Sequence, residues 1–134
     1  HIIRDGRDVI LSRHPHTTHR QYHVEPAQWV ADVKEGLKYA DRDNFLTIRY
    51  ESLIGDFEST MATVCEHLGI DLNERILNFY EHASVRKNPA YFSGLQKMHS
   101  NSIGKWKKPE YKERVEELLS CPGAKELLGE LGYL

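Results

Sequence analysis

Strands are scarce in this chain, and that scarcity limits the folds open to it. Two segments of the 134 residues have the composition of strands: the apolar run His1–Arg4, and Phe45–Tyr50, which is rich in β-branched and aromatic residues. Helical patterns separate and follow them, which favours βαβ units and a parallel α/β sheet. Two parallel strands leave edges and faces uncovered. We therefore expect strands from sequence outside this chain, or from another chain, to complete the sheet.

Helices are predicted from apolar residues at helical spacing and from signals at the helix ends. Pro26 suits the first turn of a helix whose apolar face carries Trp29 and Val33, and Gly69 is placed to end another helix as a C′ glycine. A stretch rich in Gly, Ser and Asn-Pro precedes the last two helices and is expected to be irregular. The expected helices are Arg7–His14, Pro26–Ala40, Asp56–Leu68, Leu72–Glu81, Pro109–Ser120 and Gly123–Leu131, and the irregular stretch is Ala83–Lys105.

Composition excludes several classes of protein. Residues 1–134 are enough for one domain and too few for two. A net charge of −2 gives no basic field for nucleic acid, and no apolar run approaches the length of a membrane span. The two cysteines, Cys65 and Cys121, are far apart in sequence, which favours reduced thiols over a disulfide or a catalytic thiol.

The first twelve residues combine a cation and a hydroxyl in a pattern that suits an anion. Arg4 leaves the first expected strand at its C-terminal end, where open α/β sheets bind ligands. Gly6 allows a tight turn, and Ser12 lies eight residues after Arg4, in the helix expected to follow. Arginine presents a planar fork of donors suited to phosphate. The alternative is that Arg4 pairs with Asp5 or Asp8 and that Ser12 only fills a helix face.

The segment Arg4-Asp-Gly-Arg-Asp-Val-Ile-Leu-Ser12 resembles a motif of the sulfotransferase family. The family pattern is Arg-[Asn/Asp]-[Pro/Gly]-[Arg/Lys]-Asp-Val-x-x-Ser, in which the Arg and the Ser hold the 3′-phosphate of 3′-phosphoadenosine 5′-phosphosulfate. The resemblance therefore implies that Arg4 and Ser12 bind this 3′-phosphate.

Three later segments resemble the same family in the expected order. Leu46–Leu53 resembles the strand that ends in Tyr-Glu-x-Leu, and the resemblance puts Tyr50 near the adenine; the alternative is an aromatic at the edge of the core. His82–Pro89 resembles a segment that contacts adenosine, with Ser84 matching and Val85 replacing a Phe. Ser102–Lys107 resembles the Gly-x-Trp-[Lys/Arg] loop that closes over the nucleotide, so Gly104, Lys105 and Trp106 are candidates, although core packing explains Trp106 equally well. His99-Ser-Asn101 replaces the family's Arg-Lys-Gly, and Ser100, Ser102 and Lys105 are candidate replacement donors.

The resemblance implies a P-loop-like α/β fold with a three-layer parallel sheet, of which residues 1–134 are the C-terminal portion. The N-terminal Gly-rich phosphosulfate loop and the general base would lie in preceding sequence. The function implied is transfer of a sulfuryl group from 3′-phosphoadenosine 5′-phosphosulfate to a hydroxyl or amine acceptor, a carbohydrate, protein or small molecule, leaving adenosine 3′,5′-bisphosphate. No metal is implied. We expect this portion alone to be inactive, and a cytoplasmic location, or a Golgi one if an anchor precedes it.

Two other functions are compatible with the sequence. A truncated sulfotransferase-like chain could keep the fold and bind nucleotide or another protein without catalysis. Another P-loop-derived enzyme such as a kinase is less well supported, because neither a Walker-type loop nor a set of Mg²⁺-binding carboxylates is visible.

Two polar stretches remain open to several interpretations. Four histidines lie at His14, His16, His19 and His23, and they suit a solvated loop, the border of an acceptor cleft or, with the 19/23 spacing, metal ligands. The lysine-rich run Lys105–Lys108 suits a solvated edge, and it would also attract a nucleotide phosphate.

Overall fold

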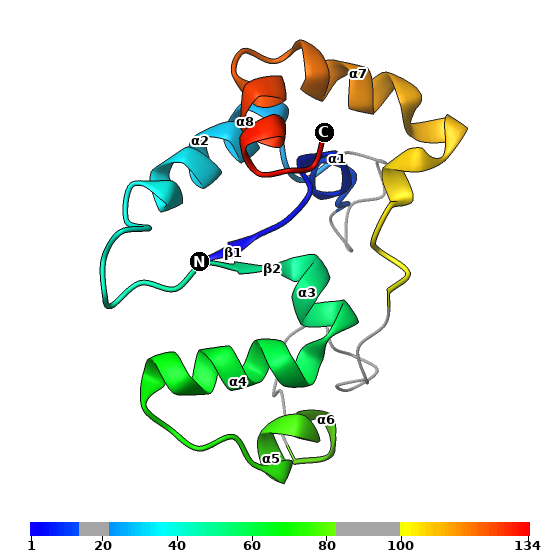
Figure 1. The fold of residues 1–134 in the computed structure, drawn as a ribbon. Helices are drawn as coiled ribbons and strands as arrows, with labels where there is room; N and C mark the ends of the chain where they lie inside the picture. The colour runs from blue at the N-terminus through cyan, green and yellow to red at the C-terminus, as the bar shows by residue number, and fades with distance from the viewer. Residues whose placement is uncertain (14–21, 83–99) are drawn as a thin grey trace.

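The computed structural model describes residues 1–13, 22–82 and 100–134. Along these ranges, short strands and helices alternate first, and helices follow (Figure 1). The elements are β1 (Ile2–Ile3), α1 (Gly6–Val9), α2 (Pro26–Leu37), β2 (Ile48–Arg49), α3 (Tyr50–Gly55), α4 (Phe57–Leu68), α5 (Glu74–Leu77), α6 (Phe79–His82), η2 (Lys105–Lys107), η3 (Pro109–Tyr111), α7 (Lys112–Ser120) and α8 (Ala124–Glu130).

The two predicted strands pair with each other, and they are parallel as expected. Ile2 lies opposite Ile48, and Ile3 opposite Arg49. The backbone nitrogen of Ile48 also donates to the carbonyl of His1 at 2.9 Å, which extends the pairing by one residue. Both strands are shorter than the sequence predicted. Within the described ranges this sheet has two strands, so the wider three-layer sheet remains a prediction.

A single hydrophobic core joins β1, α1, α2, α7 and α8, which we call the core region. In Figure 1 these helices gather above the sheet, and the chain brings α7 and α8 back against α1 and α2. Amphipathic faces predicted from sequence, including Trp29 and Val33 on α2, point into this core. Its buried members are Ile3, Ile10, Trp29, Val30, Val33, Leu118, Ala124, Leu127, Leu128 and Leu131.

Gly6 allows α1 to lie directly on α2. A Cβ at Gly6 would come within 2.6–2.7 Å of three atoms of the Trp29 indole, closer than real carbon atoms approach. The glycine therefore serves close packing between two helices. This contact fixes the strand end that carries Arg4 against the core.

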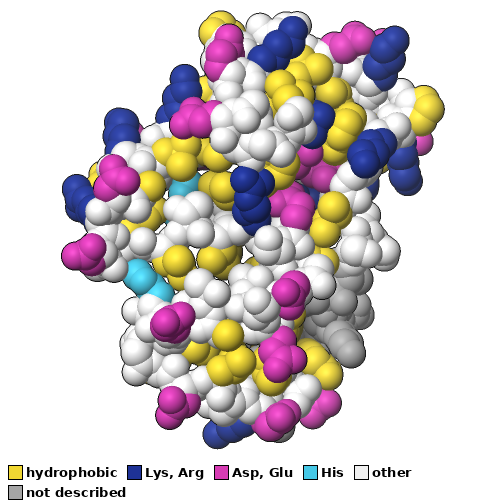
Figure 2. Space-filling model, in the orientation of Figure 1, with side chains coloured by type: hydrophobic (Ala, Val, Ile, Leu, Met, Phe, Trp, Pro, Cys, Tyr) yellow, Lys and Arg dark blue, Asp and Glu magenta, His cyan; other side chains and the backbone are white. Residues whose placement is uncertain are grey.

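The segment Tyr50–His82, which forms α3 to α6 and which we call the α4 region, buries far less. It lies below the sheet in Figure 1, and α4 packs chiefly against α3 and α5. Of α3, α4 and α5, only α4 contributes a fully buried residue, Cys65. Leu68 is 62% exposed, and Figure 2 shows hydrophobic side chains open to view over this part of the molecule.

Helix α4 begins and ends as predicted. The Asp56 carboxylate accepts from the Ser59 backbone nitrogen at 3.3 Å, which caps the free N–H groups of the first turn. Gly69 adopts φ 66°, ψ 33° and ends the helix in the left-handed conformation that glycine favours. Both signals involve residues next to the helix ends, which explains why they were readable from sequence.

Several predicted helices are also wrong in their bounds. The helix expected over Pro26–Ala40 ends at Leu37. The helix expected over Arg7–His14 is Gly6–Val9, after which Leu11 and Ser12 donate to carbonyls three residues back and the chain turns to a bridge between Arg13 and Tyr22. The helix expected over Leu72–Glu81 is split into α5 and α6, because Asn78 leaves the helical conformation at φ −103°, ψ 36°. The helix expected from Pro109 starts with a 3₁₀ turn, η3, before α7.

Candidate functional site

Three predicted nucleotide-binding residues from distant segments meet at the C-terminal ends of the two strands. The Arg4 guanidinium lies 4.4 Å from the centre of the Tyr50 ring, and it donates to the carbonyl of Ser102. The Tyr50 hydroxyl and Ser102 Oγ are 3.0 Å apart and share a hydrogen bond. The chain thus assembles a cation, a phenol and a hydroxyl around one point, across sequence separations of 52 and 98 residues.

Tyr50 reaches this position as the first residue of α3 and not as the last residue of a strand. β2 ends at Arg49, and the chain turns into the helix at once. The predicted strand Phe45–Tyr50 is therefore wrong at its C-terminal end. The helical start rotates Tyr50 toward Arg4 and places Glu51 beside it in the first turn.

Arg4 retains an unused donor. Its Nε is buried and has no hydrogen-bond partner among the described residues. The structure does not show the alternative, in which Arg4 pairs with Asp5 or Asp8. Among the described residues, Asp5 forms its ion pair with Arg7. A buried guanidinium nitrogen without an acceptor is costly, and an anion would satisfy it.

Asp8 binds the loop that carries Gly104 and Trp106. The carboxylate, on a residue 2% exposed, accepts from the Gly104 nitrogen at 2.6 Å and from the Trp106 nitrogen at 3.0 Å. Gly104 has φ 71°, a left-handed conformation that lets the loop turn toward the carboxylate. Sequence reasoning missed this role of Asp8. The opening motif contains Asp8 in its Asp-Val pair but gives it no function.

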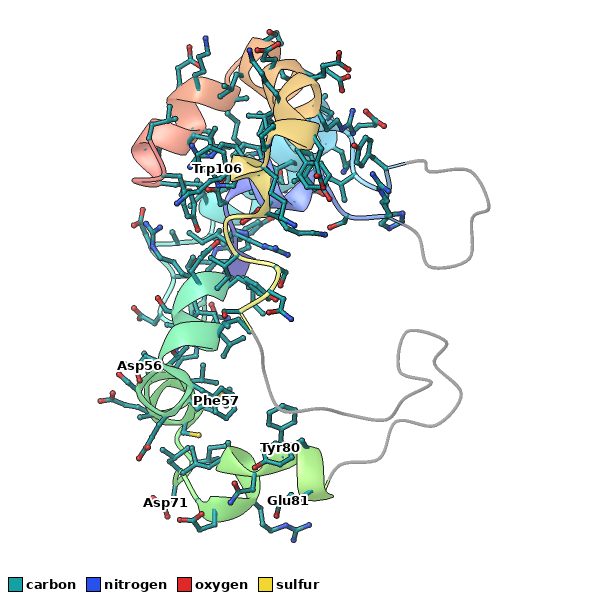
Figure 3. The ribbon with its side chains drawn as sticks, turned by 90° about the vertical axis from the view of Figure 1, so that its right-hand side faces the viewer. Asp56, Phe57, Asp71, Tyr80, Glu81 and Trp106 are labelled. Carbon is teal, nitrogen blue, oxygen red and sulfur yellow. The ribbon has the colours of Figure 1, made fainter. Side chains whose placement is uncertain are left out.

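Trp106 rests on a guanidinium and not in the core. The Arg7 carbon Cζ lies 3.7 Å from the centre of the indole, and Trp106 is half-buried, outside the core cluster. Arg7 itself is held by a buried ion pair, in which its Nη2 lies 2.8 Å from Asp5 Oδ2. In the side view of Figure 3, Trp106 lies in the upper part of the molecule, and the η2 turn that carries it contacts α1. The core-packing interpretation of Trp106 is therefore wrong.

A hollow of about 580 Å³ lies beside these contacts. Strand-end, loop and C-terminal residues line it together, and both charged and aromatic side chains face it. The described lining residues are Asp5, Arg7, Asp8, Glu51, Ile103, Gly104, Trp106, Lys107, Tyr133 and Leu134.

The remaining candidates are not part of these contacts. Ser12 follows α1; its backbone nitrogen donates to the Val9 carbonyl and its carbonyl accepts from the His23 nitrogen. Lys105 directs its Nζ to the Tyr111 ring, 6.0 Å from the centre. Ser100 is exposed. Ser84 and Val85 lie outside the described residues, as do three of the four clustered histidines.

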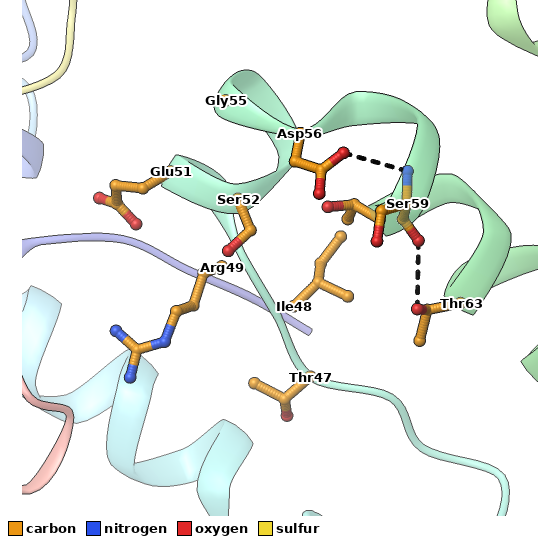
Figure 4. Close-up of a pocket in the computed structure, with 10 residues that line it drawn as sticks. Thr47, Ile48, Arg49, Glu51, Ser52, Gly55, Asp56, Ser59 and Thr63 are labelled. Carbon is orange, nitrogen blue, oxygen red and sulfur yellow. Dashed lines mark hydrogen bonds between the residues drawn. The ribbon is translucent and has the colours of Figure 1, made fainter.

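A second hollow, of about 700 Å³, lies between β2, α3 and the start of α4 (Figure 4). Hydroxyl side chains dominate its wall, and two residues of that wall also stabilise α4. The Ser59 backbone nitrogen donates to the Asp56 carboxylate at 3.3 Å, and Thr63 Oγ1 donates to the Ser59 carbonyl at 3.2 Å. None of the predicted nucleotide-binding residues is among its described lining.

Metal and disulfide chemistry find no support in the described ranges. No three His, Cys, Asp or Glu side chains there gather as a metal site. Cys65 and Cys121 are both free thiols, as the sequence favoured. No helix of the described residues has the length and apolar character that crossing a bilayer requires.

Comparisons with known proteins point to the family that the motifs resemble. A family model described as the sulfotransferase domain matches residues 1–119. A 3-beta-hydroxysteroid sulfotransferase from Cavia porcellus is 24% identical over 138 residues, covering 80% of this chain and 48% of that protein. The chain therefore spans about half the length of this relative. No solved structure matches the chain.

Proposed function

The chain belongs to the sulfotransferase family, and from this membership we propose that residues 1–134 form the part of the enzyme that binds the 3′-phosphate and adenosine of 3′-phosphoadenosine 5′-phosphosulfate. The family implies a P-loop-like α/β fold, with which the parallel β1–β2 pair is consistent. The observation that carries the proposal is the convergence of Arg4, Tyr50 and Ser102 at the strand ends.

The residues present suit an anionic nucleotide. The unpartnered Nε of Arg4 supplies a buried donor for a phosphate oxygen, and the fork of a guanidinium matches that geometry. The Tyr50 ring and hydroxyl suit a purine base, which offers both a flat face and hydrogen-bonding edges. We assign Ser12, Ser84, Val85, Ser100 and Lys105 to the same nucleotide as proposals from the sequence motifs.

The bound donor would supply a sulfuryl group to a hydroxyl or amine acceptor. This chain's residues bind and orient the nucleotide end of it, and Asp8 and Arg7 hold the Gly104–Trp106 loop against the site. Neutralisation of the leaving oxygen and deprotonation of the acceptor need further groups. We propose that these come from sequence preceding this portion.

The test is calorimetry with adenosine 3′,5′-bisphosphate on the full protein. Arg4→Ala should lose about 1.5–3 kcal/mol of binding free energy, the usual size of a charge-assisted hydrogen bond. Arg42→Ala is the matched control, because Arg42 is exposed and also lies 4.4 Å over a tyrosine ring, that of Tyr39.

Equal affinity for adenosine 5′-phosphate, or unchanged affinity in the Arg4 variant, would show that the site does not read the 3′-phosphate. A protein that binds the bisphosphate but gives no turnover with its donor and any hydroxyl or amine acceptor would favour the non-catalytic alternative.

A further inference from the structure

The C-terminal segment Leu131–Tyr133 is tied to the strand ends by four contacts. The Tyr133 hydroxyl donates to Glu51 Oε2 at 2.9 Å. Arg7 Nη2 donates to the Tyr133 carbonyl at 2.6 Å. Arg49 donates to the Leu131 carbonyl, and its guanidinium lies 5.0 Å from the centre of the Tyr133 ring. Contacts across 82 and 126 residues thus hold this segment against the strand ends.

Glu51 links Tyr133 to the residue that starts α1. While its Oε2 accepts from Tyr133, its Oε1 accepts from the Asp5 nitrogen at 3.0 Å. Asp5 in turn caps α1 through the Arg7 nitrogen at 3.0 Å and holds the Arg7 guanidinium. Glu51 also follows Tyr50 directly, so the same carboxylate fixes the first turn of α3 where Tyr50 meets Arg4.

Arg7 is the second connection between the C-terminal segment and the site. Its guanidinium contacts Asp5, the Tyr133 carbonyl and the face of the Trp106 indole. A shift of Tyr133 therefore changes the surface on which Trp106 rests. Burial, followed by the hydrogen bond to Glu51, raises the pKa of Tyr133 far above its ordinary value, so this hydroxyl remains a donor at neutral pH.

We propose that Tyr133 is a positioning residue of the candidate nucleotide site, which acts through Glu51 and Arg7 to hold Tyr50 and the Gly104–Trp106 loop in the geometry that binds nucleotide. The inference rests on the proposed function for the identity of the ligand, but the positioning of Trp106 can be measured without ligand. Tyr133 touches no residue of the Arg4–Tyr50–Ser102 group itself in the described contacts, and its effect is indirect.

The experiment compares Tyr133→Phe with Tyr39→Phe in the full protein labelled with 5-fluorotryptophan. Both variants lose one hydroxyl from a half-buried ring. The Tyr39 ring contacts Phe45 and Arg42, and among the described residues its hydroxyl has no hydrogen-bond partner. Fluorine NMR reports the Trp106 environment, with its signal assigned by Trp106→Phe. Tyr133→Phe should shift and broaden the Trp106 signal and weaken adenosine 3′,5′-bisphosphate binding about three- to tenfold, the range expected for one lost hydrogen bond. Tyr39→Phe should change neither.

Glu51→Gln provides the second variant. It keeps the size of the side chain but cannot accept both hydrogen bonds, so it should move the Trp106 signal in the same direction as Tyr133→Phe. A Trp106 signal that stays unchanged in both variants would overturn the inference, and so would an affinity that stays unchanged while thermal stability falls. If the unmodified protein binds no bisphosphate, the proposed function fails; the Trp106 signal then still decides whether Tyr133 positions the loop.

Discussion

The core region and the α4 region are built from similar helices but differ in what those helices bury. In the core region, α2, α7 and α8 close around fully buried side chains such as Leu118, Leu127 and Leu128. In the α4 region, α4 is as long as α2, at 12 residues each, yet it buries only Cys65. Figure 3 shows Phe57 and Tyr80 at the far end of the molecule from Trp106. There the Phe57 ring lies 5.6 Å from the Phe79 ring, centre to centre.

The difference shows that an amphipathic pattern yields buried area only when a second apolar surface is available. The core region has four helices to close on one another, whereas α4 packs chiefly on short neighbours. Most helical stability in proteins comes from such packing and not from propensity. We therefore expect local signals, such as caps, to matter most in the α4 region and packing to matter most in the core region.

The largest contrast should come from one substitution made in both regions. Leu128→Ala removes a side chain that is 0% exposed and should lower the free energy of unfolding by about 2–5 kcal/mol. Leu68→Ala, at a residue 62% exposed, should change it by less than about 0.5 kcal/mol. Urea denaturation measures both. Equal losses of stability in the two variants would mean that Leu68 packs against a surface outside the described contacts.

The helix caps give the next contrast. Asp5 caps α1 and pairs with buried Arg7, so Asp5→Ala leaves a buried charge unpaired and should cost about 3–5 kcal/mol. Asp56 caps α4 on the surface, and Asp56→Ala should cost about 1 kcal/mol. Thermal unfolding followed by circular dichroism compares the two. A cost for Asp5→Ala as small as that for Asp56→Ala would show that Arg7 finds another acceptor.

A smaller contrast is expected at two glycines. Gly6→Ala would place a Cβ 2.6 Å from the Trp29 ring and should destabilise the protein by about 1–3 kcal/mol. Gly55, at the end of α3, has nothing within 4 Å of an added Cβ, so Gly55→Ala should leave stability unchanged or slightly raised. The midpoint of urea unfolding measures the change in stability of both variants. A neutral Gly6→Ala would mean that α1 can move away from α2 at little cost.

The smallest expected effect on stability comes from the Tyr133–Glu51 hydrogen bond, which joins the C-terminal segment to α3. It appears only at alkaline pH. The pKa of Tyr133 is raised in the folded protein, because burial and the bond to Glu51 favour the neutral phenol. Its contribution is complete below the ordinary tyrosine value of 10.0 and should decline as the pH rises above that value, since the unfolded chain ionises first. Unfolding measured from pH 9 to 11 should show a steeper loss in the unmodified protein than in Tyr133→Phe. Identical slopes would contradict the Tyr133–Glu51 bond.

The sequence predicted those parts of the fold that depend on neighbours in the chain. Asp56 and Gly69 mark the ends of α4 because a cap and a left-handed glycine are local events. The parallel pairing of β1 and β2 was also predictable, from strands separated by a helix. Helix α1 was predicted too long. No residue near Ile10 or Ser12 carries a helix-end signal, although the chain turns there toward the bridge with Tyr22.

The candidate site was predicted in part. The motifs named Arg4, Tyr50, Ser102, Gly104 and Trp106, and the structure brings Arg4, Tyr50 and Ser102 into direct contact. The backbone nitrogens of Gly104 and Trp106 instead donate to Asp8, a buried carboxylate that the opening motif contains but to which it gave no role.

The sequence by itself determined which residues are candidates to bind an anion, because donor chemistry, glycine turns and motif spacing depend only on residue type and order. Only the tertiary structure decided which of them share a site. Glu51 accepts hydrogen bonds from Asp5 and Tyr133, which are 46 and 82 residues away in sequence, and Arg7 donates to Tyr133 across 126 residues. These contacts depend on how the core packs. Such contacts leave no periodic pattern, and packing alone selects them.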